Sequence, residues 1–584
     1  MPVIEVWAPF AKSLEVQING RKRALEQKDD SWWRLGQPVA PETDYAFVVN
    51  GQDPVPDPRS MRQPKGIDGP SQTLDHSIFV WGDDGFQPRP LSSAVIYELH
   101  VGTFSGQGTF DGVTMHLDHL LDLGVTHVEI MPVNGFSGTR GWGYDGVNLF
   151  APHEAYGGPE GFKRLVNACH AKGLAVILDV VYNHLGPAGN YLDCFGPYFT
   201  DHYQSPWGRA VNLDGAESHE VRRFFCDNAA MWLRDYRVDG LRIDAVHGFF
   251  DLSAVHFLED LRRTADQIQA QTGRYKILIA ESDLNDPRTV RPAAAGGHGM
   301  DAQWSDDFHH ALHALLTGEQ TGYYVDFGKL SHIARALTRV FVYDNQFSAF
   351  RRRYHGRPVH GLSGHRFLGY LQNHDQVGNR ALGERLSHLI SPGRLKTGAA
   401  LMLLSPFVPM LFQGEEWAAS TPFQYFTDHA DPELGEAVKK GRCREFAAFG
   451  WDPEQIPDPQ AGDTFARCVL KWEEKQSPPH AEILEWYKKL IALRKNLPDA
   501  ADGRMDRVQA TADDDAGWLV MTRGALTVAC NLAGHTQFVP VSGADRMEIR
   551  LCPEKDPQIT AAGIELPGDC VAVLYQTPAM EESG

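Results

Sequence analysis

The sequence predicts a multidomain α/β protein in which a (β/α)8 barrel of the TIM type is flanked by an N-terminal and a C-terminal β-sandwich. Between residues 94 and 416, eight short apolar runs alternate with helix-like stretches, which is typical of a parallel sheet. On both sides of this region, short segments alternate apolar and polar residues and are separated by turn residues. The chain has 584 residues, and single cores stop growing at about 250–300 residues, so several domains are expected.

Residues 1–90 are predicted to form the N-terminal sandwich. Its alternating segments are residues 5–11, 13–19 and 45–50. Asn-Gly pairs end two of them, and this dipeptide favours tight hairpin turns. Trp32 and Trp33 are expected to pack in the core, with sugar stacking as the alternative. The Pro- and Gly-rich stretch 53–71 cannot hold a helix or a central strand, so we expect an irregular connection there.

Residues 91–495 are predicted to form the barrel. Its eight strands are expected within residues 94–104, 124–132, 173–184, 238–246, 276–281, 299–305, 366–375 and 407–416. Parallel strands that are buried on both faces have near-continuous apolar sequences, and eight of them with helices between close into a barrel. The sixth run has the weakest pattern. Long intervals after the third and sixth runs predict excursions at the carboxyl end of the barrel.

Residues 496–584 are predicted to form the C-terminal sandwich. Just before it, residues 480–496 have the pattern of an amphipathic helix, with Glu485 and Lys489 one turn apart. The strands that follow are expected within residues 517–523, 525–532 and 570–577.

The composition narrows the classes of partner. The chain has 55 Lys and Arg against 75 Asp and Glu, a formal net charge of −20, which disfavours nucleic acids and anionic membranes and favours a neutral substrate. The eight cysteines are scattered without a CxxC pair, so neither a disulfide framework nor a structural zinc site is expected. The first residues carry no basic leader, and we predict a cytoplasmic location without a cofactor or a metal ion.

Polar residues collect where four of the predicted barrel strands end. They are Asp179, Tyr182, Asn183, His184, Arg242, Asp244, His247, Glu281, Asp283, Asn373, His374 and Asp375. A strand buried on both faces holds such side chains only if they pair or face a cavity. A structural ion pair, such as Arg242 with Asp179, explains one such position. Four such strand ends, those of the third, fourth, fifth and seventh runs, indicate an active site at the carboxyl end of the barrel.

This combination of side chains suits the cleavage of an acetal. A glycosidic bond needs one carboxylic acid to protonate the leaving oxygen and a second carboxylate at the anomeric centre. The two must differ in pKa, so that one is protonated while the other is ionised. We expect Arg242 to keep Asp244 ionised, and partial desolvation to raise the pKa of Glu281.

Four of these strand ends resemble the four signature regions of the α-amylase superfamily: DVVYNH, GLRIDAVH, IAES and QNHD. The resemblance spans the barrel and implies retaining chemistry at an α-glucosidic bond. It implies Asp244 as nucleophile, Glu281 as general acid and base, and Asp375 as a third carboxylate that grips the sugar. The residues implied to orient the nucleophile and the sugar are Arg242, His184, His374, Tyr144 and Asp145.

Five further segments are similar to the maltooligosyltrehalose trehalohydrolases within that superfamily: residues 280–288, 304–313, 341–356, 372–380 and 414–429. These enzymes release trehalose by cutting the α-1,4 bond next to it in maltooligosyl trehalose, so the resemblance implies this substrate and a pathway link to a synthase that makes it. It also implies three cleft-lining stretches. They comprise Arg242, Ile243, Asp244, Ala245, Val246 and His247; Asp306, Asp307, Phe308, His309 and His310; and His374, Asp375, Gln376, Val377, Gly378 and Asn379.

Two alternatives remain at this point. A 1,4-α-glucan branching enzyme shares the four regions and the N-terminal sandwich. A non-catalytic glucan-binding protein on the same barrel is the alternative from another class, although such a protein has no need of three costly acids. The histidine-rich segment 306–313 has no HExxH pattern, and we predict no metal ion there.

Overall fold

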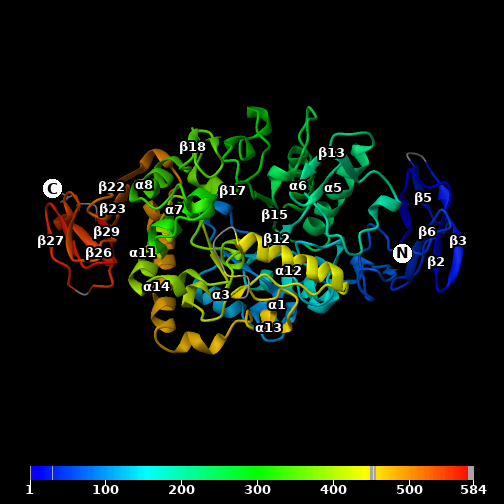
Figure 1. Cartoon of the computed structure of the whole chain (residues 1–584), viewed down its shortest axis with the longest axis horizontal. Helices are drawn as coiled ribbons and strands as arrows, with labels where there is room; N and C mark the ends of the chain where they lie inside the picture. Colours follow the sequence, from blue (N-terminus) through cyan, green and yellow to red (C-terminus); the bar gives the residue numbers. More distant parts are fainter. Residues whose placement is uncertain (1, 29–30, 448–451, 453–454, 555, 577–584) are drawn as a thin grey trace.

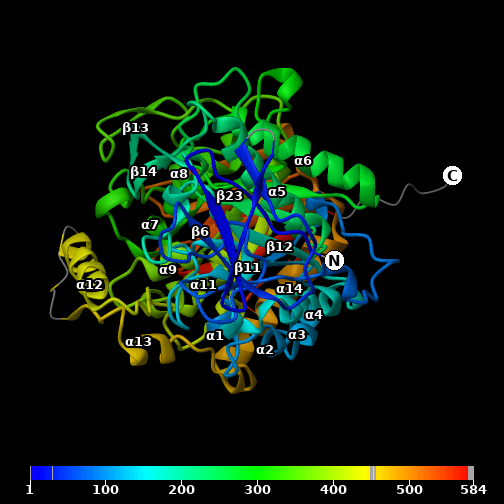
Figure 2. The ribbon, with the colours of Figure 1, turned by 90° about the vertical axis from the view of Figure 1, so that its right-hand side faces the viewer.

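The computed structural model describes residues 2–28, 31–447, 452, 455–554 and 556–576. Along the longest axis of the molecule, the barrel lies between two all-β parts, with the N-terminal sheets at one end and the C-terminal sheets at the other (Figure 1). Figure 2 looks along this axis with the N-terminal sheets in front of the barrel.

Eight parallel strands close into the predicted barrel, in the order β12-β15-β16-β17-β20-β21-β8-β9. They are β8 (Ile96–Leu99), β9 (His127–Ile130), β12 (Ala175–Val180), β15 (Gly240–Ile243), β16 (Ile277–Ala280), β17 (Ala302–Trp304), β20 (Phe367–Tyr370) and β21 (Val408–Phe412). Each lies within one of the eight predicted runs, including the weak sixth run. Closure depends on the pairing of β8 with β21, in which Ile96 lies opposite Met410. The (β/α)8 prediction is therefore confirmed.

Helices surround the barrel (Figures 1 and 2). The longer ones are α4 (Gly158–Ala171), α5 (Ser218–Arg234), α6 (Phe257–Thr272), α7 (Asp306–Thr317), α8 (Leu330–Arg339), α11 (Pro392–Leu403), α12 (Pro432–Ala447) and α14 (His480–Asn496). Shorter ones are α1 (Val101–Phe104), α2 (Phe110–Thr114), α3 (Leu117–Leu123), α9 (His374–Gly378), α10 (Leu386–Leu389), α13 (Gly462–Ala466) and α15 (Pro498–Ala501). α14 has the predicted bounds. Its buried Arg494 donates to the carbonyl oxygens of Leu403, Ser405 and Phe407, at 2.5–2.9 Å, and so fixes the turn that leads into β21.

The N-terminal part consists of two antiparallel sheets, as a sandwich requires. One sheet joins β1 (Glu5–Trp7), β5 (Trp32–Arg34) and β4 (Glu26–Gln27). The other joins β3 (Arg21–Ala24), β2 (Leu14–Ile18), β6 (Asp44–Val49) and β7 (Ser71–Gln72). The β2–β3 turn is Asn19-Gly20, and both residues have the positive φ (50° and 76°) that this dipeptide favours.

Trp32 contacts a helix of the barrel, whereas Trp33 donates within the N-terminal part to the carbonyl oxygen of Ala8. Trp33 is 7% exposed and lies in the core, as predicted. Trp32 donates its Nε1–H to Glu220 of α5 at 3.3 Å. The guanidinium groups of Arg59 and Arg223 lie 5.3 and 5.2 Å from the centre of its ring, so this partly buried ring packs against cations.

The C-terminal part also consists of two sheets. The larger has the order β22 (Val508–Asp513), β23 (Trp518–Arg523), β24 (Leu526–Asn531), β29 (Cys570–Gln576) and β26 (Met547–Leu551). The smaller joins β25 (Gln537–Pro540), β28 (Gly563–Leu566) and β27 (Ile559–Thr560). All three predicted strands are present, although the last residue of the third, position 577, lies outside the described residues.

Three excursions extend the loops that follow barrel strands. After β12 comes the hairpin of β13 (Phe199–Ser205) and β14 (Gly208–Val211), and after β17 come α7, α8 and the hairpin of β18 (Gln346–Ser348) and β19 (Arg353–His355). A third excursion, which was not predicted, carries α12 and α13 between β21 and α14. Within the described part of the chain, no helix is both long and apolar enough to span a bilayer.

Candidate active site

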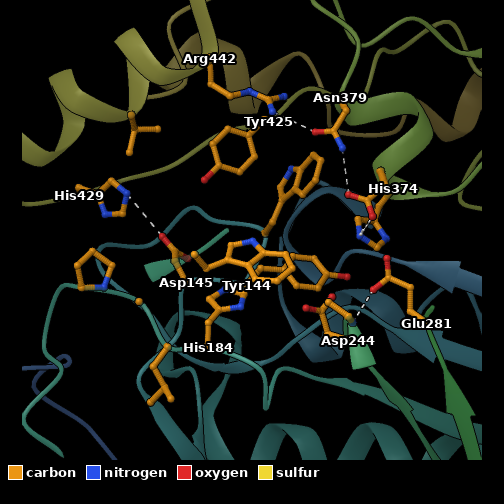
Figure 3. A pocket seen from close by; sticks show the side chains of 18 of the residues that line it. Tyr144, Asp145, His184, Asp244, Glu281, His374, Asn379, Tyr425, His429 and Arg442 are labelled. Atoms are coloured by element: carbon orange, nitrogen blue, oxygen red, sulfur yellow. Dashed lines mark hydrogen bonds and ion pairs between the residues drawn. The ribbon is translucent and has the colours of Figure 1, made fainter. Parts of the chain in front are cut away.

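A cavity of about 580 Å³ opens at the carboxyl end of the barrel strands (Figure 3). It is lined by Trp142, Tyr144, Asp145, His184, Leu185, Gly186, Pro187, Trp207, Asp244, Ala245, His247, Glu281, His374, Asp375, Asn379, Tyr425, His429, Leu434, Val438 and Arg442. All three predicted catalytic acids are among these residues.

The three acids reach the cavity from three different strand ends. Asp244 follows β15, Glu281 follows β16, and Asp375 lies in α9 after β20. Their side chains are 11%, 17% and 35% exposed, so each is largely desolvated yet still reachable from the cavity. One sugar ring in the cavity can therefore meet all three carboxylates.

Arg242 connects two of these acids from below. Its side chain is fully buried on β15, and Nη1 lies 2.7 Å from Asp179 and 2.8 Å from Asp244. Nη2 lies 2.8 Å from Glu281. Asp244 and Glu281 therefore share one guanidinium group, which fixes them as neighbours on one side of the cavity.

The backbone after Asp244 bends sharply. Ala245 has φ +39° and ψ +53°, a left-handed conformation that costs a non-glycine residue roughly 1–3 kcal/mol. This bend directs the Ala245 N–H to Oε2 of Glu281 at 2.7 Å, and the Val246 N–H donates to the Glu281 carbonyl oxygen at 3.0 Å. The strained turn thus ties the loop that carries one acid to the other acid.

The pKa values of these two acids are shifted apart, but in the order opposite to the one expected. Burial, and next the charge of Glu281, raise the pKa of Asp244 well above its usual value, although Arg242 opposes this. Burial also opposes ionisation of Glu281, but Arg242, the Ala245 N–H and His247 outweigh it and lower its pKa. The expected order was wrong because Arg242 faces both acids, while the backbone donor faces only Glu281.

His374 places a positive charge beside the third acid. Its Nε2 lies 3.6 Å from Asp375, its Nδ1 bonds to Glu98 of β8, and its backbone N–H donates to Glu98 at 3.0 Å. Burial disfavours the charged imidazole, but Asp375 and Glu98 outweigh this and raise the pKa of His374 to about 9.

Aromatic rings form the floor and one wall of the cavity. Tyr144 stacks on His374, with centroids 4.9 Å apart and planes 19° apart, and its hydroxyl donates to Asp179 at 2.5 Å. His184 stacks on Trp207 at 5.1 Å, and Trp207 is 43% exposed. Flat aromatic faces of this kind suit the apolar face of a sugar ring.

The remaining implied residues divide into two groups. Ala245, His247, Asp145, His184 and Asn379 line the cavity with the acids. The others do not line it: Ile243, Val246, Asp306, Asp307, Phe308, His309, His310, Gln376, Val377 and Gly378. The implied stretches are thus only partly accessible from the cavity.

The resemblance implied that residues 306–310 line the cleft, but most of their side chains point from α7 into the protein interior. Phe308 has no exposed surface and packs against Phe407, with centroids 5.2 Å apart. Asp307 accepts the backbone N–H of Tyr343 at 2.7 Å. Asp306 is influenced by the site, since burial and the charges of Glu281 and Asp375 raise its pKa to about 7.

The cavity also has residues that were not predicted. Leu185, Gly186 and Pro187 follow β12, and five others come from the excursion after β21: Tyr425, His429, Leu434, Val438 and Arg442. His429 lies 3.5 Å from Asp145, and Leu434, Val438 and Arg442 follow on α12 at intervals of four residues. This spacing puts the last three on one face of the helix. That pattern, in a long interval after the eighth strand, is the signal that could have found them. In the part of the chain that the structure covers, no three His, Cys, Asp or Glu side chains are grouped as metal ligands.

Comparison with known proteins places this geometry in a family. Residues 93–203 match the family model described as alpha amylase, catalytic domain. A malto-oligosyltrehalose trehalohydrolase from Arthrobacter ramosus is 49% identical over 576 residues, which cover 97% of this chain and 98% of that protein. The same enzyme from Mycobacterium tuberculosis H37Rv is 47% identical, with 93% and 94% covered.

Other matches are partial or more distant. A 1,4-alpha-glucan branching enzyme from Vibrio parahaemolyticus is 31% identical over 40% of this chain and 34% of its own. The crystal structure of a protein described as an alpha amylase, from Salmonella typhimurium, aligns with a TM-score of 0.90 and 35% identity over 98% of this chain and 97% of that one. A pullulanase from Anoxybacillus, at 19% identity and a TM-score of 0.72, covers 98% of this chain and 86% of that one and shows the shared fold alone.

Three observations agree on the family. The trehalohydrolases are 47–49% identical over nearly their full length, the barrel is closed, and the three acids lie in one cavity. The branching-enzyme alternative has weaker and partial similarity, and the non-catalytic alternative has no support from these relatives. The chain belongs to the malto-oligosyltrehalose trehalohydrolase family of glycoside hydrolases.

Proposed function

We propose that this enzyme hydrolyses the α-1,4-glucosidic bond next to the terminal trehalose of maltooligosyl trehalose and releases trehalose. One observation carries the chemistry: Asp244 and Glu281 share the Arg242 guanidinium at the mouth of a closed barrel, with Asp375 in the same cavity. The substrate follows from the near-full-length similarity to trehalohydrolases.

In the first half of the reaction, Glu281 gives its proton to the glycosidic oxygen as the bond to the anomeric carbon breaks. Asp244 forms a covalent bond to that carbon, and trehalose leaves. As the glycosidic bond breaks, positive charge develops at the anomeric carbon beside Asp244 and stabilises the Asp244 carboxylate. The proton shared by Asp244 and Glu281 therefore resides on Glu281 during this step. Tyr144 supports the sugar ring from below, and Asp375 binds its hydroxyl groups.

In the second half, Glu281 removes a proton from water. The water oxygen bonds to the anomeric carbon, the bond to Asp244 breaks, and the glucan leaves with its α configuration retained. Arg242 stays below both acids, so neither carboxylate has to be desolvated without a counter-charge at any stage.

The test is the product profile from maltotriosyl trehalose, with the anomeric configuration of the glucan followed by NMR. We expect free trehalose and maltotriose released as the α anomer. Initial release of the β anomer would contradict the retaining mechanism. New α-1,6 branch points without trehalose would instead support the branching-enzyme alternative. Asp244→Asn should abolish both products while the protein still folds.

We also propose a cytoplasmic location, which the eight free thiols support, because a reducing compartment keeps cysteines unpaired. The substrate has to come from a reaction that converts the reducing end of a maltooligosaccharide into a trehalose unit. A link to such a synthase is part of the same proposal.

A further inference from the structure

Helix α12 forms one wall of the cavity, and one of its side chains reaches the catalytic region. Leu434, Val438 and Arg442 face the cavity, while Lys439 and Lys440 pair with acids elsewhere. The Arg442 guanidinium lies 4.7 Å from the centre of the Tyr425 ring, which holds the side chain in an extended position over the cavity (Figure 3).

Arg442 makes two hydrogen bonds to the end of α9. Nη1 donates to Oδ1 of Asn379 at 3.0 Å, and Nη2 donates to the carbonyl oxygen of Gly378 at 2.9 Å. Gly378 has no room for a side chain, because a Cβ atom there would lie 2.1 Å from the Trp142 ring. The two acceptors are therefore held at a fixed position beneath the helix.

Asn379 links Arg442 to the third acid, Asp375. Its Nδ2 donates to Oδ1 of Asp375 at 3.2 Å, while its Oδ1 accepts from Arg442. An amide that was rotated by 180° would set its oxygen against the Asp375 carboxylate and its NH2 group against the guanidinium, and both contacts would repel. Arg442 thus decides which end of the Asn379 amide faces Asp375.

We propose that Arg442 is a positioning residue for Asp375: it locks the Asn379 amide so that the NH2 group stays on the carboxylate. The inference rests on the proposed function, since it assumes that Asp375 acts on the sugar. Asp375 is then held from two sides, by Asn379 at Oδ1 and by His374 at Oδ2, and cannot turn away from the cavity.

The charge balance around Asp375 explains why this donor matters. Burial raises the pKa of Asp375, His374 opposes this, and Glu281 adds to it. The titratable and charged groups around it are His374, Glu98, Arg242, Asp244, Glu281, Asp306, Tyr144, Tyr323 and Tyr370. With four other carboxylates in this set, the loss of a donor to Asp375 favours its protonation, which removes the acceptor that grips the sugar.

The test compares Arg442→Met with Arg442→Lys and with a control on the same helix. Arg442→Met should lower kcat about 5- to 50-fold with little change in KM. Without Arg442 the Asn379 amide can rotate, and its hydrogen bond to the charged Asp375 carboxylate is then lost in the transition state. The acid limb of the kcat/KM profile should move to higher pH. Arg442→Lys keeps a cation and a donor and should recover part of kcat. Arg444→Met removes an exposed arginine of α12, whose Nε donates along the helix to the carbonyl oxygen of Lys440, and should change neither parameter.

A double-mutant cycle with Asn379→Leu tests the route of the effect. If Arg442 acts through Asn379, the double variant should lose no more activity than Asn379→Leu alone. An additive loss, an unmoved pH profile, or a rise in KM with kcat unchanged would overturn the inference, because each would make Arg442 only a part of the cavity wall. Should Arg442→Met not fold, Asn379→Leu carries the pH measurement.

Failure of the inference and failure of the proposed function are distinguishable. Asp375→Asn should abolish turnover. Normal turnover of that variant would remove the role proposed for Asp375, and the inference with it. An inactive Asp375→Asn together with a fully active Arg442→Met would overturn the inference alone.

Discussion

Replacing Glu281 by glutamine tests the acid and base role most directly. In Glu281, Oε2 accepts the Ala245 N–H at 2.7 Å. The amide oxygen of glutamine can accept the same N–H, so the loop geometry should persist. What is lost is proton transfer, which is worth roughly 10²- to 10⁴-fold, or about 3–5.5 kcal/mol of transition-state stabilisation. Turnover of maltotriosyl trehalose, measured as released trehalose, should fall by this factor.

A substrate with a better leaving group separates the two halves of the reaction. Fluoride departs from α-maltosyl fluoride without protonation, so Glu281→Gln should still form the covalent intermediate on Asp244 and release one equivalent of fluoride. Azide needs no general base, and it should therefore restore turnover and yield an α-glycosyl azide. Intact-protein mass spectrometry should detect the intermediate when azide is absent.

The same variant changes the titration of Asp244. The charge of Glu281 is a main cause of the raised pKa of Asp244, second only to burial. With that charge removed, the pKa of Asp244 falls, so the acid limb of fluoride release should move to lower pH than in the unmodified enzyme. A limb that moved to higher pH would contradict the arrangement around Arg242.

A matched control is available at another strand end. Glu415 is buried after β21, where it bonds to Tyr487 at 3.1 Å, and burial raises its pKa to about 8. It does not line the cavity, so Glu415→Gln should leave trehalose release within about twofold of the unmodified enzyme. If Glu281→Gln kept more than a tenth of normal turnover, or if the two variants behaved alike, Glu281 would not be the general acid.

Three further predictions follow from single contacts. Tyr144→Phe keeps the ring but loses the hydrogen bond to Asp179, so kcat/KM should fall roughly tenfold, for a cost of about 1–3 kcal/mol, without loss of fold by circular dichroism; an unchanged kcat/KM would argue against this contact. Phe308→Ala should lower the free energy of unfolding by about 3–5 kcal/mol, measured in urea, while KM stays within about twofold, because Phe308 is core and not cleft; a large rise in KM would restore it to the substrate cleft. The folded pKa of His374 is about 9 against about 6.5 unfolded, so its stabilisation of up to about 3 kcal/mol is complete below pH 6.5 and is lost as pH rises through 9. His374→Gln should therefore flatten the fall in stability between pH 6.5 and 9.5, and a fall as steep as in the unmodified enzyme would contradict that charge state.

The barrel could be predicted because a strand that is buried on both faces has a nearly continuous apolar sequence. Even β17, the weakest run, kept this signal through Ala302 and Trp304. β3, by contrast, has four exposed residues, so Arg21–Ala24 carries no alternation that sequence analysis could detect. The bounds of the three domains at residues 90 and 495 stay predictions.

The site could be predicted in part. The three acids and Arg242 were found because charged residues at the end of a buried strand are costly unless they serve a cavity. The pKa order of Asp244 and Glu281 could not be foreseen, since it depends on the Ala245 N–H that a left-handed turn directs to one of them. The wall formed by α12 was also missed, because the fold of a long loop depends on contacts far along the chain.

The pairing that closes the barrel bears on how the protein is made. On one edge of β8, Ile96 pairs with His127 of β9, about thirty residues later in the chain. On the other edge it pairs with Met410 of β21, which is synthesised more than 300 residues after Ile96. Until that segment leaves the ribosome, the nascent sheet keeps an open edge of unpaired backbone groups, which invites association with other chains. Contacts so distant in sequence also slow folding. Production of this enzyme should therefore respond to chaperone supply and to lower growth temperature more than the stability of the finished barrel alone would suggest.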